Sequence, residues 1–146
     1  MNICVMLIVF TGMGTPLGHT TSFVESRAEG VILAAPEDAK LHQDCRLKKP
    51  AGKAIFHTFV AATSAGNWEA GRVEFPEIDS YIDVDTPHPG SAETRPDGSS
   101  YGSISWRVIG GGGMFKGATG IVTGNFTGEA DGSFVDHQLY KLFLPN

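Results

Sequence analysis

Apolar and polar residues alternate with a period of two along most of the chain from about residue 20 onward, and glycine, proline and Asp-Gly turns separate the alternating stretches. This period places neighbouring side chains on opposite faces of a strand, whereas an amphipathic helix needs a period of about 3.6 residues. Residues 53–63 are apolar on both faces, which predicts a strand sandwiched between two layers. Residues 77–85 place Ile82 and Val84 on one face and acidic residues on the other, which predicts one strongly acidic side.

Turn residues predict how these strands connect. The turn at residues 96–98 leads into a strand in which Trp106 and Val108 share one face and Arg107 lies on the other. The Asp-Gly pair at 131–132 predicts a hairpin before the last strand. About six to eight antiparallel strands leave exposed edges unless they form a sandwich or close into a barrel. We therefore expect one all-β domain over residues 1–146 with little helix.

Three segments do not follow the alternation. Residues 35–49 carry the only helix signal, with Pro36 and two acidic residues suited to a first turn, although a loop and a strand fit equally well. Residues 85–100 hold three prolines and no apolar period, which predicts a long surface loop. Residues 1–10 are apolar but contain no Lys or Arg, which favours an N-terminal strand over a secretion signal.

Charge and cysteine content exclude several classes of protein. The formal net charge is −5 and no long basic run occurs, which argues against a nucleic-acid partner. No apolar run approaches the roughly twenty residues that a bilayer span needs, so we expect no membrane partner. Cys4 and Cys45 form one disulfide or none. We expect a cytoplasmic protein, with secretion as the alternative, in which case the sequon at Asn125 becomes relevant.

The segment 109–120 packs six glycines into twelve positions. It lacks the order of a Walker A loop, because Lys116 precedes Gly117, and it lacks the spacing of a dinucleotide-binding fingerprint. It predicts a strand that ends near Ile109, a glycine turn with Phe115 as a buried anchor, and a new strand from Ile121. Glycines recur further along the chain, and such strands bend sharply enough to close a barrel, so we expect a closed antiparallel barrel of about eight strands.

Residues 108–122 resemble the Gly-Gly-Thr-Gly-x-Phe-x-x-Ala-x-Gly segment of dirigent proteins and its counterpart in allene oxide cyclases, with Gly112 where threonine is usual. The resemblance implies a calycin-like barrel with an apolar cavity, commonly a homo-oligomer such as a dimer or trimer. It also implies a protein that cyclises or orients reactive hydrophobic molecules without a cofactor. No catalytic residue is carried over from either family. The residues that carry the resemblance are Gly111, Gly113, Phe115, Ala118 and Gly120.

Candidate site residues follow from the expected barrel interior. His57 lies in the strand predicted to be buried on both faces, so it has either a structural partner or a role as a general base in the lumen. Tyr140 and Arg107 are suitable donors to an oxyanion or enolate, and Trp106 is a natural pocket wall. Either face of the last strand, that of Asp136, Gln138 and Tyr140 or that of His137 and Lys141, could line the lumen. The predicted catalytic residues are His57, Tyr140 and Arg107, and the predicted substrate-binding residues are Trp106, Phe59, Phe126, Tyr81 and Phe143.

Two other patterns favour ordinary structural roles. Ser100 matches a Gly-x-Ser-x-Gly elbow, but it follows a turn and enters a strand, so we interpret it as a hairpin serine. The acidic residues of 77–85 indicate a solvated outer face more than a cation site, and the histidines show no metal-binding spacing.

The expected function is that of a cofactor-independent cyclase or isomerase acting on a hydrophobic small molecule in the barrel cavity. The alternative is a non-catalytic lipocalin-like or dirigent-like protein that binds or orients such a molecule. A third interpretation is a structural or host-interaction protein whose barrel is filled with side chains.

Overall fold

The computed structural model describes residues 2–18, 22–34 and 53–145. These ranges hold nine strands and two short 3₁₀ helices. The strands are β1 (Asn2–Pro16), β2 (Phe23–Ala34), β3 (Lys53–Thr63), β4 (Gly66–Phe75), β5 (Ser80–Asp85), β6 (Ser91–Thr94), β7 (Ser100–Gly112), β8 (Thr119–Gly128) and β9 (Ser133–Leu144), and the helices are η2 (Pro76–Ile78) and η3 (Gly113–Phe115).

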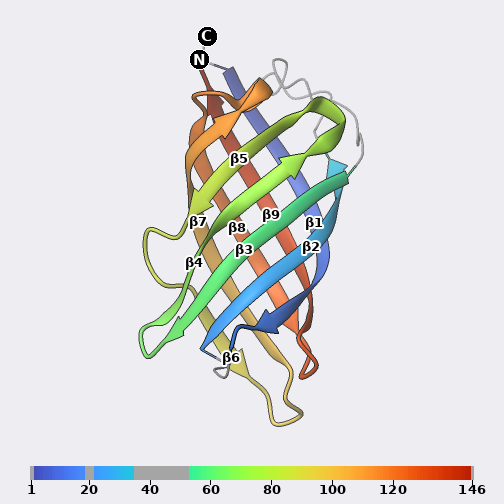
Figure 1. The fold of residues 1–146 in the computed structure, drawn as a ribbon, viewed down its shortest axis with the longest axis vertical. Coiled ribbons are helices and arrows are strands. Elements are labelled where there is room, and N and C mark those ends of the chain that lie inside the picture. The colour runs from blue at the N-terminus through green and yellow to red at the C-terminus, as the bar shows by residue number, and fades with distance from the viewer. Residues whose placement is uncertain (1, 19–21, 35–52, 146) are drawn as a thin grey trace.

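Eight of the strands close into an antiparallel barrel (Figure 1). The hydrogen-bonded order runs β5-β4-β3-β2-β1-β9-β8-β7, and pairing of β5 with β7 completes the ring. Closure removes the unpaired edges that an open sheet of this size would expose. The prediction of a single closed all-β barrel of about eight strands is confirmed, and so is the N-terminal strand.

The glycine-rich segment connects two barrel strands. β7 ends at Gly112, the turn passes through Gly113 at a φ of 62°, and β8 begins at Thr119. A positive φ favours glycine because it has no Cβ to collide with the backbone. Phe115 is fully buried at the end of this turn, and its ring centroid lies 5.1 Å from that of Phe75. The predicted turn with a buried aromatic anchor is therefore confirmed, with strands that extend further on both sides.

The prediction of a surface loop over 85–100 is wrong for its middle part. Ser91–Thr94 form β6, which pairs with β7 outside the barrel ring, from Ser91 opposite Ser103 to Thr94 opposite Ser100. All four β6 residues are exposed, so the strand depends on backbone pairing and shows no apolar period. The helix suggested for residues 35–49 lies outside the described residues.

The interior next to the chain termini is filled by apolar side chains. Met6, Phe75, Phe115 and Leu142 are each at most 2% exposed there. Cys4 is also buried, and it is disulfide-bonded; Cys45, the other cysteine of the sequence, lies outside the described residues. Among the described residues, side chains therefore fill the interior at this end of the barrel.

Candidate functional site

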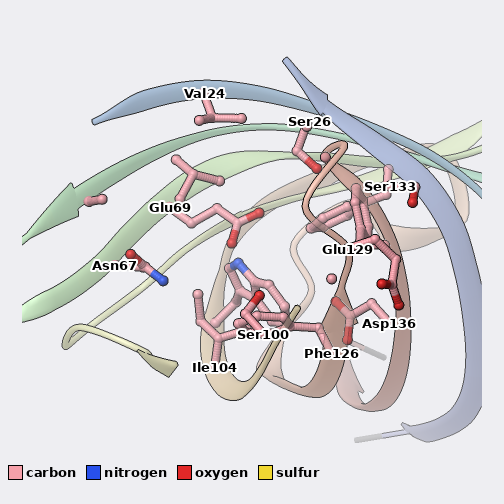
Figure 2. Close-up of a pocket in the computed structure, with 18 residues that line it drawn as sticks. Val24, Ser26, Asn67, Glu69, Ser100, Ile104, Phe126, Glu129, Ser133 and Asp136 are labelled. Carbon is pink, nitrogen blue, oxygen red and sulfur yellow. The ribbon is translucent and has the colours of Figure 1, made fainter. Parts of the chain in front are cut away.

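A cavity of about 310 Å³ lies at the end of the barrel that holds the β8–β9 turn, and Figure 2 shows the residues that line it. In Figure 1 this turn lies at the end opposite the chain termini. Inward-facing residues of β2, β3, β4, β7, β8 and β9 form most of its wall. The larger apolar lining residues are Val24, Phe56, Val60, Ile104, Trp106, Phe126 and Phe134. The polar ones are Ser26, Asn67, Glu69, Ser100, Glu129, Ser133 and Asp136. Its volume lies at the lower end of the range of roughly 300–1,000 Å³ that is common for small-molecule sites.

Glu69 is placed on the cavity wall by the alternation of β4, which turns Glu69, Val73 and Phe75 to the inside. The buried hydroxyl of Thr58, on the neighbouring strand β3, donates a hydrogen bond to the Glu69 carboxylate. Burial, with a smaller contribution from the nearby Asp136 charge, raises the pKa of Glu69 to about 7, although the Thr58 hydroxyl and the Trp106 indole oppose the shift. A carboxyl group with such a pKa is present in both its protonated and its ionised form at neutral pH, so it can act as an acid or as a base.

Asp136 begins a row of polar side chains on the inner face of β9. The Tyr140 hydroxyl donates to Gln138 Oε1, and Gln138 Nε2 donates to Asp136 Oδ2 at 2.8 Å. All three side chains are buried, with at most 4% exposure. Burial raises the pKa of Asp136, although the Gln138 hydrogen bond and the His137 charge oppose the shift. Asp136 Oδ1 is buried without a hydrogen-bond partner, so its capacity to accept a hydrogen bond is not met within the described residues.

Trp106 supplies a second unsatisfied polar atom. Its side chain is 1% exposed, and its Nε1 has no hydrogen-bond partner. The indole N–H lies near enough to the Glu69 carboxylate to lower that group's pKa, without meeting hydrogen-bond geometry. The ring packs edge-on against Phe56, with centroids 5.6 Å apart. A buried N–H without a partner is costly, so its presence in a cavity wall favours a ligand-facing role.

Gly124 on β8 makes room for this arrangement. A Cβ at this position would lie 2.8 Å from Asp136 Oδ1 and 3.0 Å from the nearest Trp106 ring atom. Any larger residue would displace one of those two side chains. Gly124, one of the recurring glycines, thus leaves the space that the Asp136 and Trp106 side chains occupy in the cavity wall.

Barrel topology places the two carboxyl groups on opposite walls. β4 and β9 are four strands apart around the eight-stranded ring, and Trp106 on β7 lies between them. Figure 2 shows Glu69 and Asp136 pointing into the cavity from separate strands. None of the residues that line the cavity in the described ranges is Lys, Arg or His. The cavity therefore combines apolar walls, two inward carboxyl groups and no balancing cation.

The structure brings three predicted site residues inside the barrel. Trp106 and Phe126 line the cavity. Tyr140 is fully buried behind the cavity wall and reaches it only through Gln138 and Asp136. Burial raises the pKa of Tyr140 well above its usual value, so its hydroxyl stays protonated. The inward face of the last strand is the one that carries Asp136, Gln138 and Tyr140.

His57 lies on the outer surface, so the predicted placement in the lumen is wrong. Register turns Phe56 and Thr58 inward and leaves the His57 side chain 33% exposed, with Nε2 2.9 Å from Glu25 Oε1. The outer side of β3 carries the apolar Phe59, which is 42% exposed. Its ring packs against His57 and against Phe23 of β2. An apolar outer face of this kind imitates the pattern of a strand buried on both sides.

The remaining predicted site residues also face outward. Arg107 pairs with Asp85 through Nε at 2.6 Å and Nη2 at 3.1 Å. Tyr81 lies under the Arg72 guanidinium, 3.8 Å from the ring centroid, and Phe143 alternates outward on β9. With Phe59, these residues were expected in the pocket, and the strand register excludes them from it. Asp83 and Asp85 form ion pairs with arginines on the outer face, as expected of a solvated stripe.

Glu69 was missed by the sequence reasoning, and Asp136 was considered only as part of one of two alternative faces. The signal for Glu69 lies in residues 66–75, where it shares its alternation with Val73 and Phe75. An acidic residue on an otherwise apolar face is the pattern that would have found it. Ser100 also lines the cavity, while His137 faces outward, so the two do not form a nucleophile and base pair.

Comparison with known proteins adds no assignment. No protein-family model matches the chain, and no curated protein matches it. No group of three or more His, Cys, Asp or Glu side chains in residues 2–18, 22–34 and 53–145 is arranged to hold a metal ion. Within the same ranges, no helix has both the length and the apolar character to cross a bilayer.

Proposed function

We propose that this protein binds a mainly apolar small molecule in the barrel cavity and isomerises or cyclises it by proton transfer, without a cofactor. The observation that carries the proposal is the pair of inward carboxyl groups, Glu69 and Asp136, on opposite walls of an otherwise apolar cavity. A barrel stabilised only by its core would gain from apolar residues at both positions, because burying an unpaired carboxyl group is costly. A cavity of about 310 Å³ also argues against a barrel filled with side chains.

Glu69 is the proton-transferring group in this proposal. Its carboxylate takes a proton from one ligand atom, and the resulting acid returns a proton to another atom of the same ligand. The protein and the ligand then end with the protons they began with, so no oxidant, reductant or cofactor is required. A pKa of about 7 suits both steps at neutral pH. The Thr58 hydrogen bond fixes the orientation of the carboxyl group.

Asp136 and Trp106 are the positioning groups. Asp136 Oδ1 holds a polar group of the ligand, and the Gln138 and Tyr140 row fixes the carboxylate that does so. The Trp106 N–H is available to a ligand oxygen on which negative charge develops. Fixing both reactant and proton acceptor in one geometry lowers the entropic cost of the reaction.

The resemblance to allene oxide cyclases and dirigent proteins supports the same proposal. That resemblance implies a small barrel with an apolar cavity, and the closed eight-stranded barrel with its mainly apolar cavity is consistent with it. Membership of that group of calycin-like barrels, and assembly into a dimer or trimer, belong to the proposal.

Deuterium transfer to the ligand tests the proposed chemistry. The ligand that the protein retains is extracted from its natural producing cells, identified by native mass spectrometry, and incubated with purified protein in D2O. We expect the wild-type protein to incorporate deuterium or form an isomer, and Glu69→Gln to lose this activity while still binding the ligand. Glu74→Gln, which changes an outward carboxyl group on the same strand, is the matched control. Binding with no exchange and no isomer in the wild-type protein would instead support the non-catalytic carrier.

A further inference from the structure

The cavity has an excess of negative charge that nothing within it balances. Glu69 and Asp136 point into it, the exposed Glu129 also contacts it, and no lining residue in the described ranges is cationic. On the outer surface, by contrast, Glu25, Asp83 and Asp85 are each paired with an arginine. Inside the barrel, the positive charge must come from a ligand or the carboxyl groups must hold protons.

Asp136 offers a direct bonding position for such a charge. Its side chain is more than nine-tenths buried, and Oδ1 has no partner in the protein. Gln138 occupies Oδ2, so Oδ1 is the oxygen left for a donor on the ligand. A hydrogen bond to an ionised group is stronger than one between neutral groups, which makes a charged donor the best match.

The walls around the carboxyl groups suit an organic cation. Phe56, Trp106, Phe126 and Phe134 present aromatic rings to the cavity. Aromatic faces attract a cation such as an ammonium group and also accommodate hydrocarbon. A metal ion would need several oxygen or nitrogen ligands close together, and no group of three or more His, Cys, Asp or Glu arranged for this occurs in the part of the chain that the structure describes.

We infer that the ligand is a small, mainly apolar amine whose protonated nitrogen binds Asp136 Oδ1, with the hydrocarbon part against the aromatic wall. The inference rests on the proposed function, because it names the ligand class for the same cavity. Glu69 on the opposite wall adds attraction for the ammonium group and remains in place for proton transfer. The bound cation favours the ionised form of Glu69.

Binding of such a cation is linked to proton release. Glu69 faces Asp136 from β9, Thr58 from β3 and Trp106 from β7, and Glu129 lines the same cavity from the β8–β9 turn. Burial favours the protonated form of these carboxyl groups, whereas a bound ammonium group favours their ionised form. Amine affinity should therefore rise with pH through about 7, where Glu69 titrates.

Three probes of one shape separate charge from size. We would measure binding of 1-naphthylmethylamine, 1-naphthylmethanol and 1-naphthoate to the wild-type protein by isothermal titration calorimetry at neutral pH. We expect the amine to bind about ten- to a hundredfold more tightly than the alcohol, as a hydrogen bond to a charged group predicts, and the naphthoate to bind least. Repeating the amine titration in buffers of different ionisation enthalpy should show net proton release.

Conservative variants place the effect at the named carboxyl groups. Asp136→Asn should reduce the preference for amine over alcohol to less than about threefold, because its amide keeps the shape but not the charge. Glu69→Gln should reduce it less and should abolish most of the proton release. Glu74→Gln should leave both quantities unchanged.

The outcomes for the wild-type protein decide the inference even if a variant fails to fold. Equal binding of amine and alcohol, or tighter binding of naphthoate, overturns the amine inference but leaves the proposed function to the deuterium experiment. Failure of all three probes to bind overturns it as well. If the wild-type protein strongly prefers the amine but transfers no deuterium and forms no isomer, the amine inference stands and the catalytic proposal is overturned.

Discussion

Carboxyl groups on the two faces of the barrel wall lie in opposite environments. On the outer face, Glu25 accepts a hydrogen bond from Arg27 at 2.9 Å. Hydrogen bonds from Arg27 and, to a smaller extent, from His57 lower the pKa of Glu25 below its usual value. On the inner face, burial raises the pKa of Glu69 and Asp136, and no basic side chain lines the cavity in the described ranges. The face of the strand on which a carboxyl group lies, more than its residue type, therefore decides whether its pKa is raised or lowered.

The largest contrast between the two faces is expected for tryptophan. Trp106→Ala should lower the free energy of unfolding by about 3–5 kcal/mol, because the side chain is 1% exposed and leaves a cavity. Trp68→Ala, at 41% exposure, is the control and should cost about 1 kcal/mol or less. Urea denaturation measures both values. Equal losses for the two variants would show that Trp106 is not part of the inner wall.

The next effect is the pH dependence of stability that Glu69 contributes. Its folded-state pKa is raised from 4.5 to about 7, so the folded protein holds a proton that the unfolded chain releases, and this contribution to stability is lost as pH rises through about 7. Glu69→Gln removes that loss and keeps an acceptor for Thr58. Between about pH 4.5 and pH 8 the variant should therefore gain up to about 3 kcal/mol relative to the wild-type protein.

Unfolding curves recorded at several pH values measure this gain. Glu74→Gln changes an exposed carboxyl group of the same strand, so its stability should run parallel to that of the wild-type protein at every pH. Parallel curves for Glu69→Gln as well would contradict the inward-facing, partly buried environment of the Glu69 carboxyl group.

A smaller effect is expected for the ion pairs outside. Asp85→Asn breaks the bond to Arg107, whose side chain is 59% exposed, and should cost about 0.2–1 kcal/mol. Added salt should reduce the difference between the variant and the wild-type protein, because exposed pairs are screened. A loss of several kcal/mol that is insensitive to salt would place this pair in a buried setting.

The smallest effect is expected for His57. His57→Asn should leave probe binding and turnover unchanged, because the side chain lies on the outer face beside Glu25. Calorimetric titration of 1-naphthylmethylamine and the deuterium assay are the readouts. A large loss of probe binding or of turnover would contradict the placement of His57 outside the site.

The barrel was predictable because its signals are local. Alternation defined the strands, Asp131-Gly132 marked the β8–β9 turn, and the glycine segment before Phe115 marked the β7–β8 connection. β6 was not predictable in this way, since its four residues are exposed and carry no pattern.

The site depends on which face of each strand points inward, and alternation alone defines two faces without naming the inner one. For β3, the apolar Phe59 lies exposed on the outer face, so the sequence pattern wrongly predicted that this face, and His57 on it, are buried. For β9, both faces were kept open, and only closure of the ring placed Asp136 inside. Glu69 and Asp136 face the same cavity only because the barrel closes with β4 opposite β9, and the sequence of neither strand alone predicts this.

The most direct measurement of the inner carboxyl environment is a carbon-13 NMR titration of protein labelled at the glutamate side-chain carboxyl carbons, with the Glu69 signal assigned by its absence in Glu69→Gln. A Glu69 signal that titrates with a pKa of about 7, well above those of the exposed glutamates, is the expected result. A signal that titrates near 4.5 with the others would contradict the inward-facing, partly buried Glu69 carboxyl group on which the site and its proposed chemistry depend.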